Sequence, residues 1–154
     1  AHNVTLGRRV ILANGALLGG YVSIGDFAFI SGNALIHQFC RIGRLAMVGG
    51  GAGISKDIPP FCTARSVTPN AVMGLNVVGM RRAGIEAAQR KIIRLCFDII
   101  FRRGFNTAQA LAELEAIPDP GPYPAEFIAF IRTAKRGICK LYASGSGDDG
   151  DEAE

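Results

Sequence analysis

The sequence predicts a parallel β-helix of hexapeptide repeats followed by a small α-helical C-terminal domain. Three observations predict it: an aliphatic residue recurs at every sixth position, small residues hold fixed places around it, and amphipathic helical patterns begin after a pair of prolines. We expect a β-helix of about three coils over residues 1–60, the helical domain over 61–143 and a disordered acidic tail over 144–154.

The aliphatic residue of the repeat keeps its place nine times without a slip. These residues are Leu6, Leu12, Leu18, Ile24, Ile30, Ile36, Ile42, Val48 and Ile54. A period of six matches neither the 3.6-residue turn of a helix nor the alternation of an ordinary strand, but it suits a short strand followed by a corner. The residue after each aliphatic position is mostly glycine, alanine or serine, which permits a tight bend. Three faces close one coil, so residues 18 apart should stack about 4.8 Å apart through parallel pairing.

The repeats end at residues 57–60, Asp-Ile-Pro-Pro, because consecutive prolines cannot donate to a strand ladder. We expect a linker over residues 61–67. Thr68 and Pro69 then have the pattern of a helix start, with threonine as the cap and proline in the first turn. This pattern predicts a short helix to about Arg82.

Three further helices are expected over residues 85–103, 106–117 and 124–141. An apolar stripe, a terminal Gly104 and a capping box of Asn106 with Gln109 support the first two, and Pro124 opens the last. This domain can cover the C-terminal end of the solenoid, which would otherwise expose a cross-section of its core. Nothing in the chain covers the other end, so we expect the β-helix to be truncated at its N-terminus.

The composition predicts a cytoplasmic protein with a basic body. No stretch has the roughly 18 apolar residues that cross a bilayer, and no signal-peptide pattern opens the chain. Five of the thirteen acidic residues lie in the last seven positions, which leaves a net charge of +9 on the rest. That charge suggests a phosphate, an acidic protein or a nucleic acid as partner, or only a solvated basic surface.

The four cysteines are widely spaced and form no C-x-x-C pair. They are Cys40, Cys62, Cys96 and Cys139. Neither a zinc site nor a disulfide framework is indicated, so we expect buried thiols.

Two histidines lie within the repeats and are the candidates for chemistry. His37 takes a slot otherwise held by tiny residues, so its ring should project outward, as a functional group or as an ordinary surface histidine. His2, Gly20 and Gln38 are each 18 residues apart and should form a ladder on one corner. A histidine can take a proton from a sugar hydroxyl that attacks a thioester, and a glycine N–H can hold the resulting oxyanion. Neither step needs a metal or a cofactor, and two histidines do not suit a carbonic-anhydrase-like site with three histidine ligands.

Six short stretches carry a resemblance to a known family. They are residues 1–7, 11–14, 36–40, 47–50, 57–60 and 74–82. Over most of residues 1–142 the chain resembles the C-terminal portion of the UDP-N-acetylglucosamine acyltransferases of lipid A biosynthesis. The resemblance implies a left-handed parallel β-helix, a homotrimer with clefts between its subunits, and acyl carrier protein and UDP-N-acetylglucosamine as partners, with no nucleic acid. The implied reaction moves a (R)-3-hydroxyacyl chain from the carrier to the 3-hydroxyl of the sugar.

The resemblance also implies roles for single residues. His2 would be the general base and Gly20 the oxyanion donor. The implied substrate contacts are His37, Gln38, Tyr21, Asn76 and Arg82, and the implied acyl-chain pocket contains Met47 and Gly50. Tyr21 stands where the family commonly has a second histidine. The basic residues of the helical domain would meet the acidic carrier protein.

Two other interpretations stay open at this point. The same scaffold could act on another nucleotide sugar or take its acyl group from acetyl-coenzyme A. The chain could also be a non-catalytic trimeric β-helix.

Overall fold

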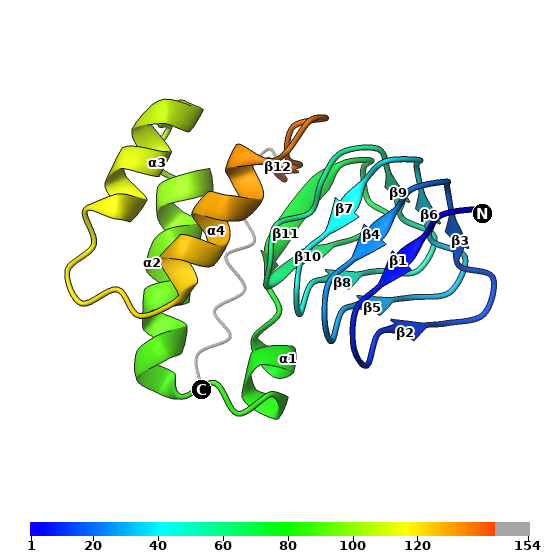
Figure 1. The fold of residues 1–154 in the computed structure, drawn as a ribbon, viewed down its shortest axis with the longest axis horizontal. Helices are drawn as coiled ribbons and strands as arrows, with labels where there is room; N and C mark the ends of the chain where they lie inside the picture. Colours follow the sequence, from blue (N-terminus) through cyan, green and yellow to red (C-terminus); the bar gives the residue numbers. More distant parts are fainter. Residues whose placement is uncertain (144–154) are drawn as a thin grey trace.

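The computed structural model describes residues 1–143, and the β-helix is confirmed (Figure 1). Nine two-residue strands build it: β1 (Thr5–Leu6), β2 (Ile11–Leu12), β3 (Leu17–Leu18), β4 (Ser23–Ile24), β5 (Phe29–Ile30), β6 (Leu35–Ile36), β7 (Arg41–Ile42), β8 (Met47–Val48) and β9 (Gly53–Ile54). They form three parallel faces, β1-β4-β7, β2-β5-β8 and β3-β6-β9. Every pair joins residues 18 apart, such as Leu6 with Ile24 and Leu18 with Ile36. The predicted register is therefore the observed one.

The aliphatic positions of the repeat fill the interior of the prism from the second coil onward. Ile24, Ile30 and Ile36 are at most 2% exposed, whereas Leu6 and Leu12 of the first coil are 48% and 40% exposed. The first coil lies at the end of the solenoid that is remote from the helices (Figure 1). Burial in the core thus increases toward the helical region.

Each face ends in a four-residue corner, and stacked corners form three edges of the prism. We call residues 1–4, 19–22 and 37–40 the site corner, residues 7–10, 25–28, 43–46 and 59–62 the docking corner, and residues 13–16, 31–34 and 49–52 the glycine-rich corner. The third residue of every such turn has a left-handed backbone, from φ 51° at Arg9 to φ 76° at Gly15. One backbone conformation therefore repeats at all three corners, and only the side chains differ.

The segment after the prolines forms strands where we predicted a linker and a helix. The hairpin of β10 (Cys62–Ala64) and β11 (Ala71–Leu75) adds to β8, with Thr63 opposite Met47. The helix predicted over 68–82 is thus wrong in its first half, because an open strand edge was available for pairing. Only α1 (Val77–Arg82) is helical, and the Asn76 side chain caps it.

The next two helices agree with the predictions. They are α2 (Ala87–Phe101) and α3 (Thr107–Glu115). The capping box of Asn106 with Gln109 is present. Phe97 of α2 joins the same core as the solenoid interior, so the helical region covers the C-terminal end of the solenoid as expected. No helix within residues 1–143 has the length and apolar character to cross a membrane.

The last predicted helix is shorter than expected. α4 (Tyr123–Arg132) ends nine positions before the predicted end, and β12 (Lys140–Leu141) follows as a strand. Gly137 has a left-handed backbone with φ 76°. Asp57 N–H donates to Gly137 O, and Cys139 N–H donates to Asp57 O. These bonds hold the chain extended against the solenoid, which a helix could not satisfy. The predicted disordered tail, residues 144–154, lies outside the described residues.

Backbone groups cover the last strand of all three solenoid faces. Ile58 N–H donates to Arg41 O beside β7, and β10 pairs with β8. Asn70 N–H donates to Gly53 O beside β9, and the Asn70 side-chain oxygen accepts from the N–H groups of Ser55 and Lys56. The C-terminal edge of the solenoid is therefore paired on every side.

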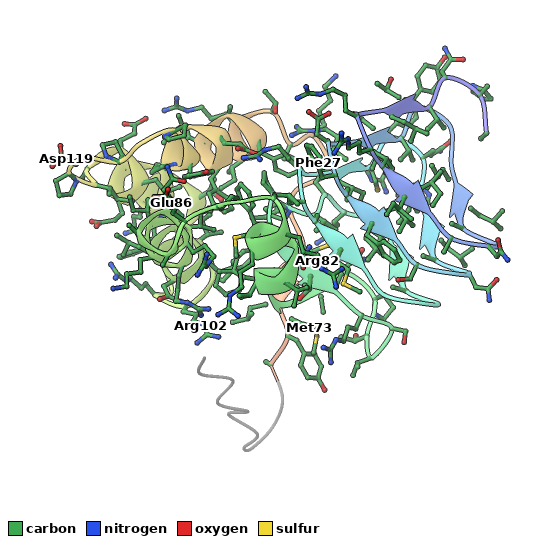
Figure 2. All side chains as sticks on the ribbon, turned by 90° about the horizontal axis from the view of Figure 1, so that it is seen from below. Phe27, Met73, Arg82, Glu86, Arg102 and Asp119 are labelled. Atoms are coloured by element: carbon green, nitrogen blue, oxygen red, sulfur yellow. The ribbon has the colours of Figure 1, made fainter. Side chains whose placement is uncertain are left out.

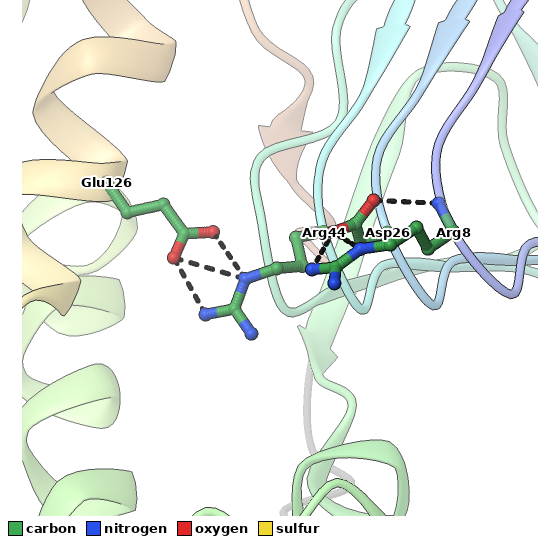
Figure 3. A network of polar contacts seen from close by, with 4 residues as sticks. All are labelled: Arg8, Asp26, Arg44 and Glu126. Atoms are coloured by element: carbon green, nitrogen blue, oxygen red, sulfur yellow. Dashed lines mark hydrogen bonds and ion pairs between the residues drawn. The ribbon is translucent and has the colours of Figure 1, made fainter.

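Charged side chains connect the docking corner to α4 (Figure 3). The Arg44 guanidinium donates to both carboxylate oxygens of Glu126, at 2.8 and 3.1 Å, and this bond raises the pKa of Arg44 further. Arg44 also lies over the Phe61 ring, 4.9 Å from its centroid. The docking corner thereby fixes the helical region on the solenoid.

Candidate functional site

His2 lies directly against the backbone of Gly20. A Cβ added to Gly20 would lie 3.1 Å from His2 Cε1 and 3.3 Å from Nε2. Tyr21 N–H donates to His2 O at 3.2 Å. The close approach therefore depends on the missing side chain at position 20, and the expected ladder of His2 over Gly20 is present.

The backbone amide of Gly20 is hydrogen-bonded only on its carbonyl side within the described residues. Gly20 O accepts from Phe39 N–H at 2.9 Å, but Gly20 N–H donates to no acceptor within residues 1–143. Gly20 itself is buried. A buried and unpaired N–H next to an imidazole can stabilise negative charge that develops beside that imidazole.

An aromatic pair extends from His2 along the site corner, with Tyr21 against His2 and Phe39 against Tyr21. The Tyr21 and Phe39 rings stack in parallel, with centroids 5.1 Å apart and planes 6° apart. The His2 ring meets Tyr21 nearly at right angles, with centroids 5.4 Å apart. Phe39 was not among the predicted site residues, although its position 18 residues after Tyr21 is the signal that would have found it.

His37 and Gln38 complete the site corner, and both are exposed. The His37 ring projects outward as expected, with Nδ1 3.1 Å from Gln38 O. His37 also borders a groove of about 500 Å³ on the β3-β6-β9 face. The apolar side chains of this groove are Leu17, Leu18, Leu35, Ile36, Ile54 and Pro69. The groove was not predicted, although the repeat places its residues Leu17 and Leu35 on the outside of the solenoid.

The other predicted site residues lie elsewhere on the chain. Met47 is on β8, and Gly50 is on the glycine-rich corner. Arg82 is exposed at the end of α1, at the junction of the solenoid and the helices (Figures 1 and 2). Both ends of the Asn76 amide are bonded internally, to Leu45 O at 2.8 Å and to Gly79 N–H at 3.0 Å. A single chain therefore brings His2, Gly20, Tyr21, His37 and Gln38 to one corner and leaves these four residues outside it.

The four cysteines are buried, as predicted. Burial raises the pKa of Cys40 to about 11 and the pKa values of Cys96 and Cys139 to about 12, and it raises that of Cys62 as well. The thiols are therefore neutral and poor nucleophiles near neutral pH. Within residues 1–143 no group of three or more histidine, cysteine or acidic side chains has the geometry for a metal ion.

Comparison with protein families gives one clear match. The family described as "Udp N-acetylglucosamine O-acyltransferase; Domain 2" matches residues 57–139. The chain is also 38% identical over 139 residues to the acyl-(acyl-carrier-protein)–UDP-N-acetylglucosamine O-acyltransferases of Anaeromyxobacter sp. (strain K) and Anaeromyxobacter dehalogenans. The alignments cover 90% of this chain and 54% of those proteins, so the chain spans about half the length of the relatives it matches.

Solved structures agree in fold. A UDP-N-acetylglucosamine acyltransferase from Bacteroides fragilis is 38% identical with a TM-score of 0.84, over 90% of this chain and 54% of that one. The Arabidopsis enzyme is 33% identical with a TM-score of 0.80, over 91% and 52% of the two chains. The Francisella novicida enzyme is 29% identical with a TM-score of 0.85, over 90% and 50%. The similarity includes both the solenoid and the helical region.

Proposed function

The chain belongs to the UDP-N-acetylglucosamine O-acyltransferase family, and on that basis we propose that the protein transfers a (R)-3-hydroxyacyl chain from acyl carrier protein to the 3-hydroxyl of UDP-N-acetylglucosamine. This reaction would be the first step of lipid A biosynthesis. The observation that carries the proposal is the His2 ring held against Gly20, whose N–H has no other acceptor in the described part of the chain.

In the proposed reaction His2 is the general base. Its unprotonated ring nitrogen takes the proton of the sugar hydroxyl while that oxygen bonds to the thioester carbonyl carbon. The electron pair of the carbonyl moves onto its oxygen, where the Gly20 N–H stabilises it. The C–S bond then breaks, and the leaving sulfur takes the proton from His2 to give the free carrier thiol. The acyl group ends as an ester on the sugar.

The remaining residues suit the two substrates. His37 and Gln38 would bind the sugar nucleotide beside His2, and Tyr21 would border the acyl group. Asn76 and Arg82 would bind the uridine diphosphate, since a guanidinium fits phosphate oxygens with two parallel bonds. Met47 and Gly50 would line the acyl-chain pocket. The exposed basic side chains of α2, which include Lys91 and Arg94, would meet the acidic carrier protein.

We further propose that three copies assemble, because the residues for one site lie on different sides of one chain. The outward residues of β1-β4-β7 are polar, namely Thr5, Ser23 and Arg41. The outward residues of the two other faces are mainly large and apolar, and Ile11, Leu17 and Leu35 are each more than half exposed. A closed ring of three joins two different patches of each subunit. In such a ring a neighbour would bring its own Met47 and Gly50 toward His2.

The test compares donors and variants of the purified protein. With UDP-N-acetylglucosamine as acceptor, we expect acyl transfer from 3-hydroxyacyl carrier protein and none from acetyl-coenzyme A. His2→Ala should lower kcat by about 10²- to 10⁴-fold, whereas Thr5→Ala, an exposed change on the same coil, should not. Transfer from acetyl-coenzyme A alone would favour the other substrate interpretation. Undiminished activity of His2→Ala would exclude His2 as the base.

A further inference from the structure

Tyr21 and Phe39 keep large aromatic rings in a backbone conformation that disfavours them. Their φ angles are 59° and 66°, in the left-handed region that glycine and asparagine adopt more easily. At the glycine-rich corner the same turn position holds Gly15, Asn33 and Gly51. The left-handed backbone therefore has a conformational cost at Tyr21 and Phe39 that it would not have at glycine.

Burial offsets that cost in the two docking-corner turns next to the helices, but not at Arg9 and Phe27 of the same corner, which are exposed, nor at the site corner. Leu45 and Phe61 have the same left-handed backbone and are 4% and 0% exposed in the core of the helical region. Tyr21 and Phe39 are 48% and 53% exposed. Core packing therefore does not account for the rings of the site corner. Tyr21 contacts both Phe39 and His2, and Phe39 contacts Tyr21.

His2 lacks the usual means of orienting a base. A catalytic imidazole is normally held by a hydrogen bond from its second ring nitrogen to a carboxylate or carbonyl. Within residues 1–143 neither ring nitrogen of His2 has a hydrogen-bond partner. The ring is held instead by Gly20 on one side and by the Tyr21 ring at 87° on another.

We propose that Tyr21, supported by Phe39, is a positioning residue that fixes the His2 ring over Gly20 by aromatic packing. The proposal rests on the function proposed above and goes beyond it, because it gives Tyr21 a role toward the base in addition to its place beside the acyl group. Edge-to-face contact restricts the imidazole while it leaves both ring nitrogens free for proton transfer. Phe39 stacks in parallel on the Tyr21 ring and keeps that ring from turning away.

The test replaces the ring and then restores it. Tyr21→Leu should lower kcat about 10- to 100-fold with a smaller change in KM, because a misplaced base weakens the chemical step more than substrate binding. Tyr21→Phe should restore most of that loss, since it returns the ring without the hydroxyl. Leucine is compatible with the turn, as Leu45 shows. Phe27→Leu, at the same turn position of the docking corner, is the matched control.

A second comparison separates positioning from direct contact with substrate. In a His2→Ala background, Tyr21→Leu should cause little further loss, because Tyr21 acts through the missing ring. An equal loss in both backgrounds would overturn the proposal. So would a Tyr21→Phe variant as impaired as Tyr21→Leu, which would assign the effect to the hydroxyl.

A measurement without turnover distinguishes failure of this proposal from failure of the proposed function. The NMR signal of the His2 Cε1 proton should shift in Tyr21→Leu and move much less in Tyr21→Phe, because the aromatic ring current is lost only in the first variant. A shift in a protein without acyltransferase activity would support positioning and contradict the function. An unshifted signal in an active protein would contradict positioning by Tyr21 and leave the proposed function standing.

Discussion

The site corner and the docking corner are built on the same turn, but their side chains differ in burial. At the docking corner Leu45 and Phe61 are buried by the helical region, and Arg44 is bonded to α4. At the site corner Tyr21 and Phe39 remain about half exposed. The repeat sets where a side chain lies, and the element that covers the corner decides whether that side chain stabilises the fold or stays available to a ligand. The two corners can be tested against each other.

The largest difference should come from removing one aromatic ring at each corner. Phe61→Ala should lower the free energy of unfolding by about 3–5 kcal/mol, because it leaves a cavity between the solenoid and the helices. Phe39 lies at the equivalent turn position but is 53% exposed. Phe39→Ala should therefore lower the free energy of unfolding by about 1 kcal/mol or less. Denaturant unfolding of both variants measures this. Equal losses of unfolding free energy would show that the aromatic ring of the site corner stabilises the fold as much as that of the docking corner.

A matched pair of glycine substitutions should separate stability from activity. In Gly43→Ala the new Cβ would lie 2.3 Å from Pro60 N and 2.6 Å from Pro60 Cα. Backbone must move to admit it, at a cost of about 1–3 kcal/mol in the free energy of unfolding. In Gly20→Ala the nearest atoms belong to the His2 ring, at 3.1 Å and beyond.

We therefore expect Gly20→Ala to keep the thermal unfolding temperature and to lose acyl transfer. Calorimetry and a turnover assay on the same samples make the comparison. A Gly20→Ala protein that unfolds early but remains active would contradict the assignment of this corner to function.

The contact between Arg44 and Glu126 should give a smaller effect. Their side chains are 32% and 27% exposed, so water screens the pair only in part. A double-mutant cycle of Arg44→Gln and Glu126→Gln should give a coupling energy of about 1 kcal/mol. The same cycle for Arg8 and Asp26 should give less, because the Arg8 side chain is 82% exposed. A larger coupling energy for Arg8 and Asp26 than for Arg44 and Glu126 would contradict the expected order and would make the contact within the solenoid the stronger of the two.

The smallest effects should be those of pH, and two aspartates should act in opposite directions. Burial raises the pKa of Asp57 above its usual 3.8, although the Arg41 N–H and the charges of Arg41 and Arg136 oppose this. Between 3.8 and the raised value the folded protein binds more protons than the unfolded chain, so Asp57 makes stability fall as pH rises through that window. The Arg8 N–H lowers the pKa of Asp26, so its contribution is present above 3.8 and is lost as pH falls through the lowered value.

Thermal unfolding measured from mildly acidic to strongly acidic pH tests both signs. Asp57→Asn should flatten the slope above pH 3.8, and Asp26→Asn should flatten the slope below it. Identical profiles for the two variants would contradict the opposite shifts.

Sequence reasoning succeeded where the repeat alone determines the environment. The 18-residue register placed His2 over Gly20 because each coil repeats the path of the one before it. It failed at residues 68–75, where the Thr68-Pro69 pattern favours a helix but pairing with β10 produces a strand. It also placed the end of α4 too late. The bonds between Asp57 and the 137–139 segment, which hold that segment extended, join parts of the chain that no local pattern connects. The structure brings His2, Gly20, Tyr21, His37 and Gln38 to one corner, but the roles of these residues stay predictions, as does the assignment of Met47, Gly50, Asn76 and Arg82 to the site.

The covered C-terminal edge of the solenoid has a consequence for aggregation. A parallel β-helix offers, at each open end, three rows of unpaired N–H and C=O groups that another extended chain can join, which is how fibrils grow. Ile58, β10 and Asn70 occupy those rows on the three faces. β11 runs antiparallel to β10, and β12 covers part of its outer edge. Backbone pairing within the chain therefore occupies this edge, where a bare coil would offer its hydrogen-bonding groups to another molecule.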